Sequence, residues 1–74
     1  MILVTRSEQY EGNDVVGVFN NMKKASLAIQ RTAHKEGLMV NIPDKPGVGV
    51  FETSDSLICF FAQEVEINQN VYVD

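Results

Sequence analysis

The sequence predicts an α+β domain in which one helix packs on a mainly antiparallel sheet, in the order β-β-α-β-β(-β). Two observations lead to this prediction. Residues 21–36 combine an N-terminal cap, helical spacing of apolar residues and a following glycine. The remaining apolar runs are short, rich in β-branched residues and separated by Gly, Pro, Asn and Asp, which is typical of strands joined by turns. With 74 residues, the chain is expected to form a single domain spanning residues 1–74.

Two strands are expected before the helix. Residues 2–5 are aliphatic or β-branched and predict the first strand, and residues 11–14 supply Gly and Asn for a turn. Residues 15–19 are nearly all apolar, so we expect the second strand to be central in the sheet. The pair is then an antiparallel hairpin with residues 7–14 as its loop or irregular end.

The helix is expected to begin at Asn20 or Asn21, whose side chain can cap a free N–H of the first turn, and to run to about Glu36. Gly37 is the expected left-handed stop. One stripe of this helix carries apolar and small residues, which suit close packing on a sheet. Its members are Met22, Ala25, Ile29, Thr32 and Ala33, with Ala28 at the margin.

After the helix, we expect strands at residues 38–42, 48–51 and 57–67, and residues 71–73 as an edge strand or a frayed tail. In the longest of these strands the odd-numbered side chains, among them Cys59 and Phe61, are expected to face the helix. Ile58 and Phe60 then lie on the other face, either beneath a loop or in a self-association interface that makes a homodimer.

The tetrapeptide Val-Gly-Val-Phe occurs at residues 16–19 and again at residues 48–51. Glycine inside a strand costs stability unless something approaches closely. We therefore expect the small-residue stripe of the helix to approach both glycines, although an ancestral duplication would also explain the repeat.

Charge is strongly separated along the chain. Residues 21–35 hold four of the six Lys and Arg and no carboxylate, so this segment carries +4 while the remainder carries −8. On a helical wheel the cations form an arc with Leu27 in its middle, opposite the packing stripe. The expected partner-binding residues are Lys23, Lys24, Leu27, Arg31, His34 and Lys35. The alternative is that this arc is only a solvated face.

Catalytic groups are not evident in the sequence. His34 is the only histidine and Cys59 the only cysteine, and neither has a partner at a known motif spacing. Glu64 and Glu66 share a strand face, but an outward, solvated strand end is the more ordinary interpretation. We therefore expect no enzyme activity, no metal and no cofactor. The N-terminus has neither a signal-peptide pattern nor a membrane span, so a soluble, cytoplasmic protein is expected.

The pattern of these segments resembles a group of very small proteins of bacteria and their phages that have no assigned activity. The residues that carry the resemblance are Val4-Thr5, residues 15–20 (Val-Val-Gly-Val-Phe-Asn), Ala25 and residues 64–68, and it covers residues 2–35 and 60–68. It implies a cytoplasmic ββαβ-type fold and a phage origin, and it brings no catalytic residues.

Together these observations predict a small phage-encoded binding protein that binds a host macromolecule and inhibits or modulates it. A host protein, such as a defence or nucleic-acid-processing factor, is the expected partner. Nucleic acid is disfavoured because the net charge is −4 and phosphate contacts dominate such binding. The alternative is an oligomer that sequesters a small anionic ligand such as a nucleotide.

Overall fold

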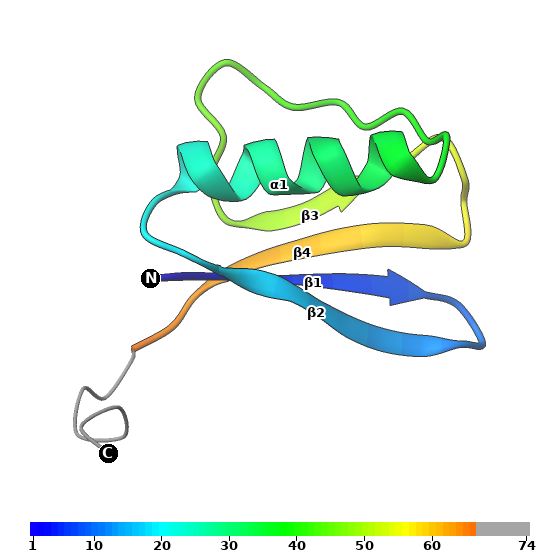
Figure 1. Cartoon of the computed structure of the whole chain (residues 1–74), viewed down its shortest axis with the longest axis horizontal. Coiled ribbons are helices and arrows are strands. Elements are labelled where there is room, and N and C mark those ends of the chain that lie inside the picture. The colour runs from blue at the N-terminus through cyan, green and yellow to red at the C-terminus, as the bar shows by residue number, and fades with distance from the viewer. Residues whose placement is uncertain (67–74) are drawn as a thin grey trace.

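The computed structural model describes residues 1–66, which form one helix and four strands in two layers (Figure 1). The elements are β1 (Ile2–Glu8), β2 (Gly12–Phe19), α1 (Met22–Lys35), β3 (Gly49–Glu52) and β4 (Ile58–Glu64). All strand pairs are antiparallel, and the strand order in the sheet is β2-β1-β4-β3. The helix lies across one face of this sheet, which confirms the predicted α+β class. The expected edge strand at residues 71–73 and the end of the last strand at residue 67 lie outside the described residues.

The β1–β2 hairpin is longer and tighter than predicted. The pairing extends from Ile2↔Phe19 to Glu8↔Gly12, so residues 7–14 do not form an irregular loop. The turn comprises residues 9–11, and Tyr10 adopts a left-handed φ of 74°. The sequence did not predict this extension because residues 6–8 are polar. Backbone pairing of these residues with both β2 and β4 makes them a strand despite their low strand propensity.

The prediction that β2 is a central strand is wrong, because β2 lies at an edge of the sheet. A bulge leaves Val16 between two paired residues, since Val4 pairs with Gly17 and Thr5 pairs with Val15. Val16 packs against the core, whereas Val15 is 68% exposed. The apolar run therefore reflects apolar side chains on both faces of an edge strand and not burial on both faces.

The helix closely matches its prediction. Asn21 is the N-cap, and its Oδ1 accepts a hydrogen bond from the Lys24 backbone N–H at 2.9 Å. At the other end Gly37 has φ 73°, and its N–H donates to the His34 carbonyl, while the Leu38 N–H donates to the Ala33 carbonyl. These two bonds form a Schellman motif. Ala25, Ile29 and Ala33 of the predicted stripe are buried, and Met22 and Thr32 are partly buried. Ser26, which the prediction did not include, is buried as well.

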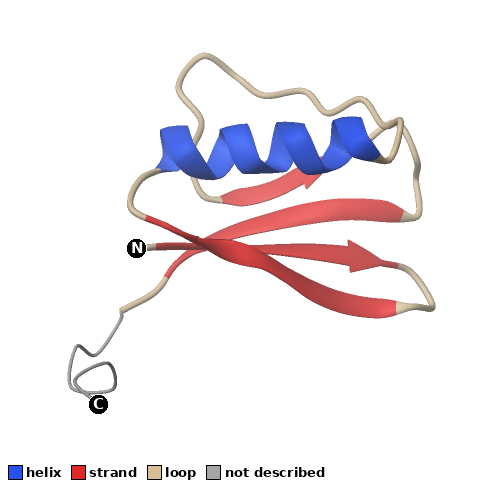
Figure 2. Cartoon of the chain, in the orientation of Figure 1, coloured by secondary structure: helices blue, strands red, loops and turns tan. Residues whose placement is uncertain are grey.

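Residues 38–42 do not form the expected strand. Only Val40 makes a β-bridge, with Thr53, and the segment runs as a loop alongside the helix (Figure 2). Leu38, Val40 and Ile42 are partly buried against the core, and the residues between them are exposed. Buried and exposed side chains therefore alternate here as they do in a strand. The segment covers one edge of the core but pairs with no neighbouring strand beyond the single bridge.

The faces of β4 are the reverse of the prediction. Ile58 and Phe60 are 8% and 0% exposed and lie on the helix side of the sheet, so they are unavailable as a self-association surface. Phe61, which was expected to face the helix, is 39% exposed on the other side. Because both sets of alternating side chains in β4 are apolar at their start, the pattern alone does not choose a face. Pairing with β1 makes that choice, because the register aligns Ala62 with the buried Val4.

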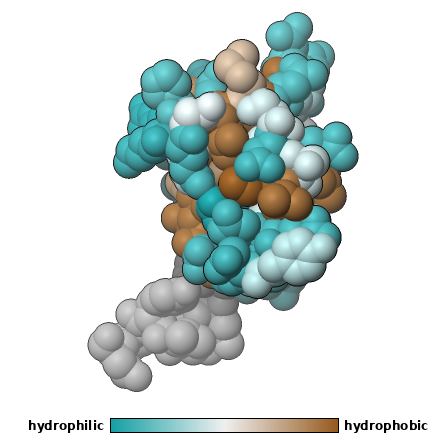
Figure 3. Space-filling view, turned by 90° about the vertical axis from the view of Figure 1, so that its right-hand side faces the viewer, coloured by the Kyte–Doolittle hydropathy of each residue, from teal (hydrophilic) through white to brown (hydrophobic). Residues whose placement is uncertain are grey.

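The core lies between α1 and the sheet. Its buried members are Ile2, Val4, Ala25, Ile29, Ala33, Phe51, Phe60 and Ala62. Figure 3 views the molecule from the end where the helix stops and the β1–β2 hairpin turns, and apolar residues reach the surface there with polar residues around them. The helix contributes mainly alanines to this core, which allows the sheet to contribute the large side chains.

The two Val-Gly-Val-Phe glycines have different roles, and close approach by the helix is not either of them. A Cβ on Gly17 would lie 3.0 Å from Cζ of the Phe19 ring, so the ring of a neighbouring residue occupies that space. At Gly49 nothing lies within 4 Å, but the backbone has φ +137°, which glycine tolerates best.

Candidate functional site

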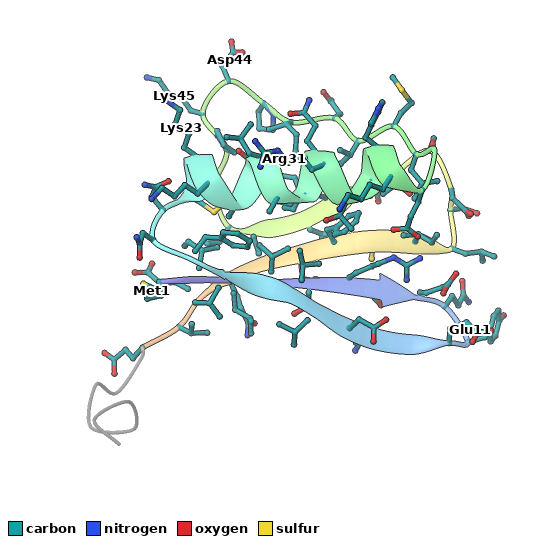
Figure 4. All side chains as sticks on the ribbon, viewed as in Figure 1. Met1, Glu11, Lys23, Arg31, Asp44 and Lys45 are labelled. Carbon is teal, nitrogen blue, oxygen red and sulfur yellow. The ribbon has the colours of Figure 1, made fainter. Side chains whose placement is uncertain are left out.

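The exposed side of α1 carries all six residues predicted to bind a partner. We call this surface the basic face. Its members are Lys23, Lys24, Leu27, Arg31, His34 and Lys35. Every one of them is exposed, and they lie opposite the buried stripe. In Figure 4, Lys23 and Arg31 mark this face on the helix. The structure therefore brings the predicted residues together, and their role in binding stays a prediction.

The cations of the basic face have no carboxylate partner among residues 1–66. The two ion pairs of the described chain both use Arg6, and neither involves the helix cations. Lys23 and Lys24 lie in the first turn of α1, at the positive end of the helix dipole. No acidic residue in that turn offsets their charge. This arrangement costs local stability and leaves the positive charges open to an external anion.

A hollow of about 470 Å³ lies beside the first half of α1 and extends the basic face. The helix contributes Lys23, Ser26, Leu27 and Gln30, and the facing loop contributes Ile42, Pro43, Asp44 and Pro46, with Met22 completing the lining. Because Asp44 and Pro46 both line the hollow, Lys45 between them lies next to the basic face (Figure 4). Sequence reasoning missed Lys45, since its turn gives no sign of folding back along the helix.

Arg6 is the one cation of the sheet, and it is already paired. Its Nε donates to Oε2 of Glu36 at 2.8 Å and its Nη2 donates to Oε1 of the same carboxylate. Nη1 lies 3.4 Å from Oε2 of Glu8. The hydrogen bonds that Arg6 donates to Glu36 raise the pKa of Arg6 above its ordinary value. Arg6 therefore joins β1 to the C-terminal end of α1, and its charge is already balanced by Glu36 and Glu8.

Acidic residues collect at the other end of the sheet. Glu8, Glu11 and Asp14 lie in or beside the β1–β2 turn, which Glu11 marks in Figure 4 far from Lys23. These carboxylates are thus far from Lys23 at the start of α1, whereas Asp44 lines the same hollow as Lys23 and Glu36 directly follows Lys35.

The candidate chemical groups do not meet. His34 is exposed on the helix, whereas Cys59 lies on the far side of the sheet, and Glu64 and Glu66 are exposed near the end of β4. Within residues 1–66 no three His, Cys, Asp or Glu side chains are grouped so that they could hold a metal ion. In the same part of the chain, the helix is too short and too polar to cross a membrane.

No family model matches the chain, and no curated protein or solved structure matches it. The resemblance to small bacterial and phage proteins therefore stays a prediction, and the site is interpreted from its own geometry.

Proposed function

We propose that this protein is a non-enzymatic binding protein whose basic face docks on an acidic surface of a partner macromolecule. The observation that carries the proposal is the row of helix cations that lack carboxylate partners in residues 1–66, grouped around the exposed Leu27. Selection for stability alone does not account for Lys23 and Lys24, because the helix dipole opposes them.

In such an interface Leu27 and the surrounding cations would make different contributions. Leu27 is 43% exposed, so a partner that covers it gains apolar burial at the centre of the contact. The surrounding cations steer the encounter and select against basic partners. An acidic protein fits better than nucleic acid, because the carboxylates of the hairpin end would repel an extended polyanion.

In the cell this interaction is proposed to occur in the cytoplasm of a bacterial host. The chain would be phage-encoded and would inhibit or modulate a host protein by occupying its acidic surface. This setting rests on the resemblance stated above and on the absence of catalytic groups that meet one another in residues 1–66.

The test is comparative capture of host proteins by a Lys24→Gln/Arg31→Gln variant and the unmodified protein. We expect the variant to bind the partner roughly 5- to 30-fold more weakly, and to recover correspondingly less of it, because two charge-assisted contacts of roughly 0.5–1 kcal/mol each are removed. The matched control is Gln9→Glu/Ser56→Glu, which changes the net charge equally at two exposed turn positions. Circular dichroism checks that both variants keep their helix. If the Lys24/Arg31 variant captures the same protein as well as the control does, the basic face is only solvated.

A second candidate function is sequestration of a small anionic ligand such as a nucleotide by an oligomer. The hollow beside α1 favours it, because Lys23 and Gln30 offer donors around one concave space. A specific nucleotide would then raise the melting temperature of the unmodified protein but not of a Lys23→Gln variant. Equal melting temperatures with and without every nucleotide tested would remove this candidate.

A further inference from the structure

The face of the sheet that points away from α1 carries exposed and half-buried apolar side chains among uncharged polar ones. We call it the open sheet face, and its apolar members are Leu3, Val15, Val18, Val50, Cys59 and Phe61. Four consecutive register partners, Val15, Thr5, Phe61 and Val50, form a row that crosses all four strands. Val15 is 68%, Val50 57% and Phe61 39% exposed.

No element of residues 1–66 covers this face. The helix and the long loop that precedes β3 both lie on the opposite side of the sheet (Figure 2). A soluble domain rarely exposes a contiguous apolar patch of this breadth unless it binds something. A chain of 74 residues also has a small core, so additional burial would matter more to it than to a larger domain.

We propose that a second copy of this chain covers the open sheet face, so that two sheets pack face to face in a homodimer. Charge supports this occupant over a charged partner. The strands place no cation on this face. They place one carboxylate there, Glu52 on the short edge strand β3. In an isologous dimer the residues close to the two-fold axis lie near their own copies, so a charged centre would repel itself.

The open sheet face is also large enough for a specific dimer interface. Three strands of seven or eight residues and one of four lie about 4.8 Å apart and rise about 3.3 Å per residue. They give a face of roughly 19 by 23 Å that is shorter along β3. Protruding side chains raise the accessible area buried to about 600 Å² per copy, so the total of about 1,200 Å² lies at the lower end of specific interfaces. We therefore expect a dimer that dissociates on dilution and not an obligate one.

The test begins with the mass of the full chain in solution, measured by light scattering and sedimentation over a dilution series. We expect a dimer at high concentration that dissociates on dilution, and a monomer at every concentration for a Phe61→Lys variant. The matched control is Met39→Lys, which changes a residue that is 77% exposed in the loop and off the face, and it should still dimerise. A Lys24→Gln/Arg31→Gln variant should dimerise as well, which separates this proposal from the proposed function.

A second measurement needs no variant. Cys59 lies on the open sheet face in the row next to Phe61, so its thiol should react more slowly with an anionic aromatic disulfide as the protein concentration rises. A monomer at all concentrations, with a constant rate of Cys59 modification, would overturn the proposal. So would a dimer in which Cys59 stays as reactive as in dilute solution, because the contact would then lie elsewhere.

Discussion

Individual residues show how one sequence motif can serve two physical purposes. Val-Gly-Val-Phe occurs in β2 and again just before and within β3, yet Gly17 makes room for the Phe19 ring whereas Gly49 supplies an unusual φ. The sequence could indicate that each glycine meets a structural requirement, because a glycine within a strand is costly. It could not indicate which requirement, since the position of the Phe19 ring and the φ of Gly49 are both set by the folded sheet.

We expect Gly17→Ala to destabilise the protein by about 1–3 kcal/mol, because its Cβ would meet the Phe19 ring at 3.0 Å and overpack a site beside the core. The matched control is Gly47→Ala, where nothing lies within 4 Å, and which should be neutral or slightly stabilising. Urea unfolding measures both changes. In a Phe19→Leu background, which lacks the ring, Gly17→Ala should destabilise the protein less than it does in the unmodified protein. Equal stability of the two single glycine variants would show that the ring moves aside without cost.

At the scale of elements, the helix was predictable, whereas the four strands were predictable only in rough position and residues 38–42 were wrongly expected to form a further strand. The signals of α1 are local, because Asn21 caps its own first turn and Gly37 closes its own last turn. Strand faces and edges depend on partners that are distant in sequence. The two alternating sets of β4 are both apolar at their start, so assigning Ile58 and Phe60 to an interface was an error that only the register with β1 could correct.

The basic face is also an element-scale feature that can be tested through helix stability. We expect Lys24→Glu to stabilise the protein by about 0.3–1 kcal/mol, because it replaces a cation at the positive end of the helix dipole and offers a carboxylate to the free N–H groups. Thermal unfolding should show a melting temperature a few degrees higher. Lys35→Glu in the last turn is the matched control and should lower the melting temperature. Shifts of the same sign for both variants would mean that overall charge, and not the dipole, governs stability here.

At the scale of the whole molecule, the site was predictable as a set of residues but not as a surface. The helical arc of six residues follows from spacing alone, and the structure places all six on one exposed face. Lys45 beside that face and the open sheet face behind it both depend on how distant segments fold back. A turn containing two prolines does not specify the direction in which it returns, and a strand pattern with apolar residues on both faces does not specify which face stays open.

The two proposed surfaces lie on opposite sides of the fold, since α1 covers one face of the sheet and the open sheet face is the other (Figure 1). A dimer through the open sheet face would therefore carry its two basic faces on opposite outer sides. They would point away from each other, so they could not line one shared ligand pocket. Such a dimer would instead present two equal docking surfaces to two partner molecules.

Bivalent binding is the consequence of combining the two proposals. In a flexible three-dimensional sensor matrix that carries the captured partner at high density, partner molecules can reach both outward-facing basic faces of one dimer. The unmodified protein should therefore dissociate at least about tenfold more slowly than from a matrix of low density. Phe61→Lys should keep the dissociation rate seen at low density in both matrices, since it retains one intact basic face. Lys24→Gln/Arg31→Gln should bind more weakly at both densities. If Phe61→Lys and the unmodified protein dissociate equally slowly at high density, the dimer contributes nothing to binding, even if the basic face does.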